Sequence, residues 1–264
     1  MRPEKRLYRE KIFRCGKYIE VYVYPVFAKQ TGRGKRRKPT SEAQKKLNEK
    51  NSARKLIRLI NTNFTEKDIR LDLTYDNDHL PESVEDAQRT CQNFLRRVNY
   101  ARKKSGMEPL KYVWVTEVGE KSGRVHHHII MSGGMDVSEL SQIWGKGYTT
   151  VKPLVFDQEY GAAALAAYMV KKPVLYKRYN SSKNLKQPEE ITRDGKLARA
   201  KVHEWAAFEN DCRDQVEAWY GCKLAEIKPF YNDINTGMYL ELHLYQPVER
   251  GGTMRKSKRK KEDS

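Results

Sequence analysis

The chain has 264 residues, enough for one substantial domain with additions or for two small domains. Its 52 lysines and arginines against 34 aspartates and glutamates give a net charge of +18, which favours a polyanionic partner, with nucleic acid as the first candidate. No run of 18 apolar residues and no apolar signal core are present, so we expect neither a membrane span nor secretion.

The N-terminal part predicts a β-hairpin followed by a basic loop. Residues 10–27 contain two β-rich runs on either side of Gly16 and Lys17, the pattern of paired strands. Residues 29–39 are rich in glycine and basic residues, which is typical of a flexible loop. In this loop we expect four side chains to contact the phosphates of nucleic acid: Lys35, Arg36, Arg37 and Lys38.

A helix is predicted next, from a capping-like start at Thr40. Its apolar residues recur at helical spacing, and its other face is basic and includes Arg54 and Arg58. Such a face is often only solvated. Beside the basic loop, contact with phosphates is the favoured interpretation.

The central part of the chain predicts two strands joined by a short turn. Before them, residues 69–75 alternate as a strand does, and a helix opens near Ser83 and runs to about Lys104. Residues 112–118 and 125–131 are both β-rich and are separated by a glycine-bounded turn. We therefore expect these two strands to pair as an antiparallel hairpin.

The remaining elements follow the same signals. In chain order they are a short helix ending at Trp144, a strand over 147–154, an alanine-rich helix from about 156 to Pro173, a polar stretch over 179–188, a helix over about 196–220, and a hairpin with its turn at 235–237.

The order of the central elements, βαββαβα around an antiparallel hairpin, predicts an α+β fold. We expect an antiparallel central sheet with helices on one side, as in ferredoxin-like or RRM-like folds. The predicted divisions are a basic N-terminal hairpin and helix extension (1–66), a core (67–188), a C-terminal helix and hairpin extension (189–248) and a disordered basic tail (249–264).

Three consecutive histidines lie in the second strand of the central hairpin. Side chains alternate between the faces of a strand, so His126 and His128 share one face and His127 points to the other. The pairing of the two strands can bring Glu117 beside His126 and His128. Two histidines alone would more often be structural, but with a carboxylate they form a three-ligand site with open positions.

The ligand types favour Mn²⁺ or Mg²⁺ as the bound ion. Glu120, in the turn, is the rival third ligand. A nucleophile is offered by Tyr168 in the alanine-rich helix, because Lys171 and Lys172 follow it at the spacing of one helix face. A nearby ammonium group favours the phenolate form of tyrosine, and either lysine could supply it.

Three motifs, TEVGEKSGR, RVHHHIIM and AYMVKK, resemble the signatures of the HUH endonucleases, the single-tyrosine rolling-circle replication initiators of small phages and plasmids. The resemblance covers about residues 68–188. In its usual form the motif has a hydrophobic residue where this chain has His127. The polar run that includes Lys183 and Asn184 is also similar, and we expect both residues to contact DNA.

This resemblance implies a metal-dependent reaction on single-stranded origin DNA. His126, His128 and Glu117 would bind the divalent ion, and Tyr168 would attack the scissile phosphate with help from Lys172 or Lys171. The tyrosine would stay linked to the 5′ end, and the released 3′-OH would prime replication.

The resemblance also implies partners. The chain contains no GxxxxGK[ST] loop, so unwinding would fall to a host helicase and synthesis to a host DNA polymerase. A single tyrosine implies a transient dimer or a second encounter to end each round. The four cysteines lack CxxC spacing, and we expect reduced thiols in the cytoplasm of a bacterial host.

Two alternatives remain open. One is a relaxase-like mobilisation nickase, although relaxases commonly place the tyrosine before the histidines and here Tyr168 follows them. The other is a non-catalytic nucleic-acid-binding protein, which would depend steeply on salt and be indifferent to chelators.

Overall fold

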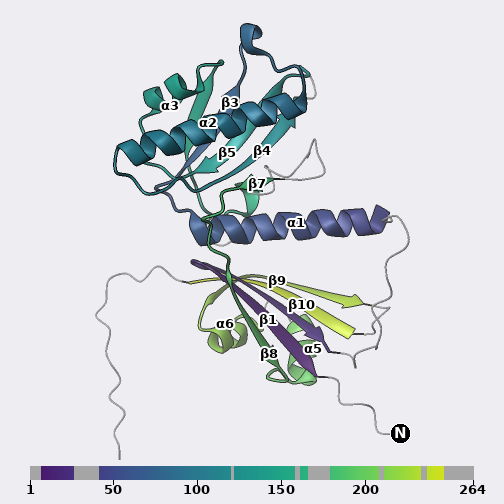
Figure 1. The fold of residues 1–264 in the computed structure, drawn as a ribbon. Coiled ribbons are helices and arrows are strands. Elements are labelled where there is room, and N and C mark those ends of the chain that lie inside the picture. The colour runs from purple at the N-terminus through teal and green to yellow at the C-terminus, as the bar shows by residue number, and fades with distance from the viewer. Residues whose placement is uncertain are drawn as a thin grey trace, which may run out of the picture.

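The computed structural model describes residues 7–26, 42–119, 122–157, 161–165, 179–207, 211–232 and 237–246. These residues form two antiparallel five-stranded sheets, and the long helix α1 (Glu42–Asn63) lies between them (Figure 1). The predicted α+β fold is confirmed. Among the described helices, none combines the length and the apolar character needed to span a bilayer.

The first sheet, here called sheet A, joins the two ends of the chain. Its strand order is β8-β1-β2-β10-β9, so the N-terminal hairpin pairs with the C-terminal hairpin through β2 and β10. Both hairpins were predicted, but the sheet they form together was not. The strands are β1 (Tyr8–Cys15), β2 (Tyr18–Pro25), β8 (Glu189–Asp194), β9 (Lys223–Asn232) and β10 (Gly237–Tyr245).

The region that follows the central core differs from the prediction. The single helix expected over about 196–220 is two helices, α5 (Arg199–Ala207) and α6 (Arg213–Tyr220). A straight helix of that length would be about 37 Å long, whereas an eight-residue strand spans only about 27 Å. The break lets Val202 and Val216 pack in the same core on one face of sheet A.

Strand β8 was not predicted at all, because its sequence hides the strand pattern. It lies at the sheet edge and contributes a single apolar side chain, Ile191, to the core. Charged pairs with β1 accompany the pairing, with Arg9 2.7 Å from Asp194. Charged edge strands are common because they resist further pairing.

The second sheet, here called sheet B, is the predicted central sheet. Its order is β6-β3-β5-β4-β7, all antiparallel, and it contains the predicted β4–β5 hairpin. The strands are β3 (Ile69–Thr74), β4 (Tyr112–Val118), β5 (Val125–Met131), β6 (Thr149–Pro153) and β7 (Asn180–Ser181). A short 3₁₀ helix, η1 (Asn77–His79), follows β3.

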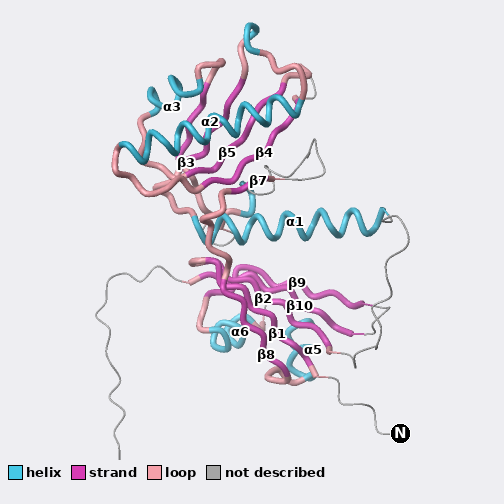
Figure 2. The backbone as a smooth tube through the Cα atoms, viewed as in Figure 1, coloured by secondary structure: helices cyan, strands magenta, loops and turns pink. Residues whose placement is uncertain are grey.

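Helices α2 (Val84–Lys104) and α3 (Val137–Trp144) cover one face of sheet B (Figure 2). The Ser83 hydroxyl caps α2 by accepting a hydrogen bond from the backbone of Asp86, 3.1 Å away. The predicted inward residues of α2 are all buried at helical spacing: Ala87, Cys91, Phe94, Leu95 and Val98. Their burial fixes the helix on the sheet.

Helix α1 covers the opposite face of sheet B, so the expectation of helices on one side only was wrong. Leu56 and Ile60 of α1 are fully buried in the same cluster as Val115 of sheet B. The length of α1 lets it serve two layers, because its other side faces sheet A. Gly16, in the β1–β2 turn, has a φ of 63°, and a Cβ there would lie 2.8 Å from the Asn61 carbonyl oxygen.

The basic residues of α1 do not play the predicted role. Arg58 pairs with Glu20 of sheet A at 2.6 Å, and Arg54 pairs with Glu241. Both carboxylates are buried, and a buried carboxylate requires a cationic partner. These two arginines therefore connect α1 to sheet A instead of facing phosphates.

The alanine-rich helix begins later than predicted. Asp157 and Gly161 exchange two backbone hydrogen bonds of 2.9 Å, and helical geometry is described only for residues 163–165. Residues 166–178 lie outside the described part of the chain.

Candidate metal centre

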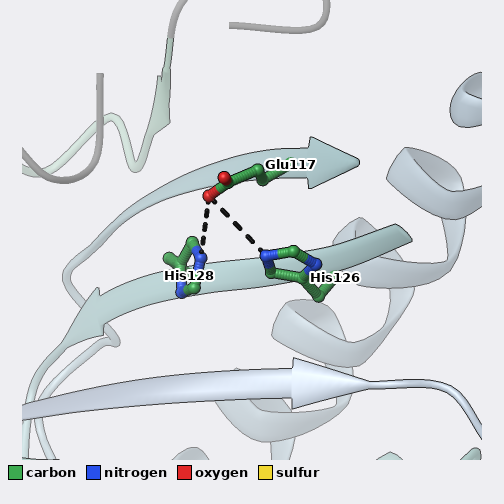
Figure 3. A group of neighbouring side chains, drawn as sticks. All are labelled: Glu117, His126 and His128. Carbon is green, nitrogen blue, oxygen red and sulfur yellow. Dashed lines mark hydrogen bonds and ion pairs between the residues drawn. The ribbon is translucent and has the colours of Figure 1, made fainter. Parts of the chain in front are cut away.

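The predicted ligands come together on one face of sheet B. Strands β4 and β5 pair with Glu117 opposite His126, and His128 follows on the same face. One oxygen of Glu117 lies 3.2 Å from Nε2 of His128 and 3.6 Å from Nε2 of His126 (Figure 3). One ligand atom from each of the three residues lies within 4.8 Å of the others.

The burial of the three side chains suits an open coordination site. His128 is 4% exposed, whereas the side chains of His126 and Glu117 are 24% and 30% exposed. The site therefore has one protein wall and one side open to water or to phosphate oxygens. Two imidazoles and a carboxylate are a donor set that fits a divalent ion with vacant positions, as in catalytic centres.

A fourth side chain, Asp72 of β3, holds His128 in place. His128 uses Nδ1, the ring nitrogen that faces away from Glu117, to donate a hydrogen bond of 2.6 Å to Asp72. Arg70 in turn binds both oxygens of Asp72, at 2.9 and 2.8 Å. Burial opposes ionisation of Asp72, but the hydrogen bonds from His128 and Arg70 prevail and lower its pKa.

This chain from Arg70 to Asp72 to His128 is the arrangement by which carboxylates orient metal-binding histidines. It was not predicted, because only the β4–β5 hairpin was used to place ligands. Strand β3 lies on the other side of β5 and sets Asp72 opposite His128. The alternation of polar residues at positions 70 and 72 was the available signal.

We expect Asp72→Asn to weaken binding of the divalent ion by about 10- to 100-fold without unfolding the chain. The amide keeps the size of the side chain but is a weaker acceptor for the His128 N–H. Calorimetric titration with Mn²⁺ measures the loss. Glu190→Gln, which removes an exposed carboxylate from sheet A, is the control, and an equal loss in both variants would contradict the assignment.

His127 lies on the other face of sheet B, as predicted. It is fully buried, and hydroxyl groups contact both ring nitrogens: Tyr75 at 2.9 Å and Thr116 at 3.0 Å. Burial, with a smaller contribution from the neighbouring His126 and His128, lowers the pKa of His127 to about 3. The imidazole is therefore a neutral core group and does not bind the ion.

We expect His127→Leu to keep the metal centre and to change the stability of the chain. Two buried hydroxyls lose a partner, which costs about 1–3 kcal/mol at pH 7. In the wild type the unfolded histidine takes up a proton below pH 6.5 while the folded one stays neutral down to about pH 3. Wild-type stability therefore falls by about 2 kcal/mol more between pH 7 and pH 5 than that of the variant.

Urea unfolding at the two pH values, with chelator present, measures this difference. A variant whose pH dependence equals that of the wild type would show that His127 is not buried in its neutral form.

The other predicted site residues divide into two groups. Outside the described residues lie Tyr168, Lys171, Lys172, Glu120 and the loop cluster Lys35, Arg36, Arg37 and Lys38. Lys183 and Asn184 follow β7, and the Asn184 amide donates to the carbonyls of Pro109 and Leu110, before β4 begins. Because β4 is extended, this end lies about 20 Å from Glu117.

Comparison with known proteins supports the predicted resemblance. Residues 68–173 match a family model for replication-associated proteins of the ORF2 type. The replication-associated protein ORF4 of Chlamydia phage 1 is 31% identical over 144 residues, which are 46% of this chain and 34% of that protein. The chain thus spans about a third of the length of the curated relative it matches. No solved structure matches it.

These matches confirm the resemblance to the Rep-type initiators of phages and associate the chain with DNA replication. The matched region runs from β3 to just beyond Tyr168 by residue number, and so contains Glu117, His126 and His128.

Proposed function

We propose that this chain initiates rolling-circle replication by nicking and rejoining single-stranded origin DNA through a 5′-phosphotyrosine intermediate. The observation that carries the proposal is the convergence of Glu117, His126 and His128 on one face of sheet B, inside the region that matches replication-associated proteins. The proposal takes Tyr168 as the nucleophile, on the basis of its motif.

The protein's contribution to the reaction begins with a preorganised set of ligands. A divalent ion held by Glu117, His126 and His128 would polarise the scissile phosphate and stabilise charge developing on its oxygens. Asp72 accepts the Nδ1 proton of His128, so Nε2 keeps its lone pair on the side of Glu117. The exposed sides of His126 and Glu117 leave room for the strand.

The covalent step exchanges one phosphodiester for another. The phenolic oxygen of Tyr168 forms a bond to phosphorus while the bond from phosphorus to O3′ breaks. The leaving oxygen takes up a proton as the 3′-OH, and the 5′ phosphate stays on the tyrosine. Lys172 or Lys171 would favour the phenolate. Rejoining is the same exchange in reverse, so the bond energy is conserved and no cofactor is consumed.

The test is cleavage of labelled single strands that tile the candidate origin. We expect nicking with Mn²⁺ or Mg²⁺, and no product with EDTA. Binding that persists in EDTA while no strand is ever cut would instead favour a non-catalytic nucleic-acid-binding protein. A relaxase-like nickase would cut strands from a transfer origin and not from a replication origin.

The proposal extends to the partners of the reaction. A host helicase would unwind the nicked duplex and a host DNA polymerase would extend the 3′-OH. With one tyrosine in the motif, termination would take a transient dimer or a second encounter with the same site.

A further inference from the structure

A row of three aromatic rings crosses sheet A far from the metal centre. Tyr24 of β2, Tyr239 of β10 and Phe230 of β9 lie side by side on neighbouring strands. The rings of Tyr24 and Tyr239 are stacked, with centroids 6.3 Å apart and planes inclined by 12°. The rings of Tyr239 and Phe230 are stacked too, at 5.0 Å and 23°.

The row lies on the side of sheet A that faces α1. Strand residues alternate between faces, and Glu241, two positions after Tyr239, pairs with Arg54 of α1. The apolar core under α5 and α6 is on the other face and includes Leu240 and Leu242. The three rings therefore do not belong to that core, which excludes the usual structural reason for such a row.

The row ends at an open edge of the sheet. Strand β9 is the last strand of sheet A, and Phe230 is 48% exposed, while Tyr24 and Tyr239 are partly exposed. Stacked rings at an edge leave the outer face of the last ring free for another planar group. The π faces of nucleobases stack on such rings, and this contact tolerates any base sequence.

Basic side chains accompany the row. Lys228 lies two positions before Phe230 on the same face, and its side chain is 52% exposed. Arg9 is the register partner of Tyr24. Both cations pair with carboxylates, Glu226 and Asp194, but exposed pairs of this kind are weak and exchange readily for phosphate.

Sequence charge on both sides of the row points the same way. The chain leaves β2 soon after Tyr24 and passes through residues 27–41, which hold six lysines and arginines and no acidic residue. In α1, Lys50 is exposed and contributes to the electrostatic environment of Glu241. A polyanion with unpaired bases satisfies both the rings and the charge.

We propose that Tyr24, Tyr239 and Phe230, with Lys228, form a second binding surface for single-stranded DNA, separate from the metal centre. It holds unpaired bases by stacking and their phosphates by charge, without reading sequence. Duplex DNA does not fit, because its bases are stacked on one another. The inference rests on the proposed function only in taking single-stranded DNA as the substrate.

The test compares two neighbouring aromatic residues of β9. Phe230→Leu removes the exposed ring from the row and keeps an apolar side chain. Tyr231→Leu does the same on the other face, where Tyr231 is 54% exposed and pairs with Met238, which packs against the α5–α6 core. Affinity is measured on the full chain by fluorescence anisotropy, with a labelled strand of about 20 thymidines in EDTA.

We expect Phe230→Leu to bind the strand about 5- to 100-fold more weakly than the wild type, and Tyr231→Leu to bind as the wild type does. Affinity for a duplex of equal length should be the same in all three proteins. Equal affinity of Phe230→Leu and wild type, or equal losses in both variants or on both DNAs, would overturn the proposal.

A second variant guards against misfolding. Phe230→Trp keeps a stacking ring, so it should bind the strand at least as well as the wild type, and its added indole emission should be quenched by DNA. Unquenched emission would also overturn the proposal. Because these measurements contain no metal, they do not depend on nicking. A wild type that never nicks would refute the proposed function and leave this surface intact.

Discussion

His128→Ala is expected to abolish nicking and to weaken Mn²⁺ binding by more than about 100-fold, because even residues that only orient a ligand contribute 10- to 100-fold. The side chain supplies Nε2 to the cluster and is the one ligand that is almost fully buried. Its loss also leaves Asp72 with Arg70 alone and without the imidazole that it orients. Titration of Mn²⁺, followed by the electron spin resonance signal of the free ion, measures the affinity.

His79→Ala is the matched control. His79 also belongs to the sheet B region and also pairs with an aspartate, Asp76, but it is not one of the clustered ligands. We expect it to bind Mn²⁺ and to nick as the wild type does. If His127→Leu lost the ion and His128→Ala kept it, the register of β5 would be displaced by one residue.

Tyr168→Phe is expected to remove the covalent protein–DNA adduct completely and to reduce nicking by several orders of magnitude, as loss of a nucleophile does. The ring is retained, so only the attacking oxygen is lost. Mn²⁺ affinity should be unchanged, because the ligands lie on β4 and β5. Denaturing electrophoresis of a strand labelled 3′ of the nick measures the adduct.

Tyr148→Phe serves as the control, since Tyr148 is 74% exposed in the same part of the chain and has no assigned role. It should form the adduct at the wild-type level. An adduct that persists in Tyr168→Phe would assign the nucleophile to another residue and would refute that part of the proposal.

The predictions succeeded where the relevant contacts are local in sequence. Glu117 and His126 are nine residues apart, and their pairing follows from a hairpin with a short turn. The alternation of side chains then separated His127 from its two neighbours. The same reasoning predicted both hairpins of sheet A and the buried face of α2.

The predictions stopped where contacts join distant parts of the chain. The pairing of β2 with β10 connects residues more than 200 positions apart, and nothing in either strand names its partner. The role of Asp72 depends in the same way on β3 lying beside β5. A basic helix face looks the same whether it meets phosphate or a buried carboxylate, which is why Arg54 and Arg58 were misinterpreted.

The arrangement of the two sheets gives the proposals a common physical basis. Helix α1 packs on sheet B through Leu56 and Ile60 and is tied to sheet A by Arg54 and Arg58. The metal centre on sheet B and the aromatic row on sheet A are therefore carried by layers that share one rigid element. A strand held on one layer could be presented to the other without a flexible linker between them.

The most direct test of the central claim is to identify the residue that carries the DNA after cleavage. The wild-type chain is incubated with a single-stranded origin fragment and Mn²⁺, digested with protease and nuclease, and analysed by peptide mass spectrometry. The account predicts a 5′-phosphonucleotide on the peptide that contains Tyr168, and none when EDTA is present. Cleavage that leaves no nucleotide on the protein, or a nucleotide on a different residue, would contradict it.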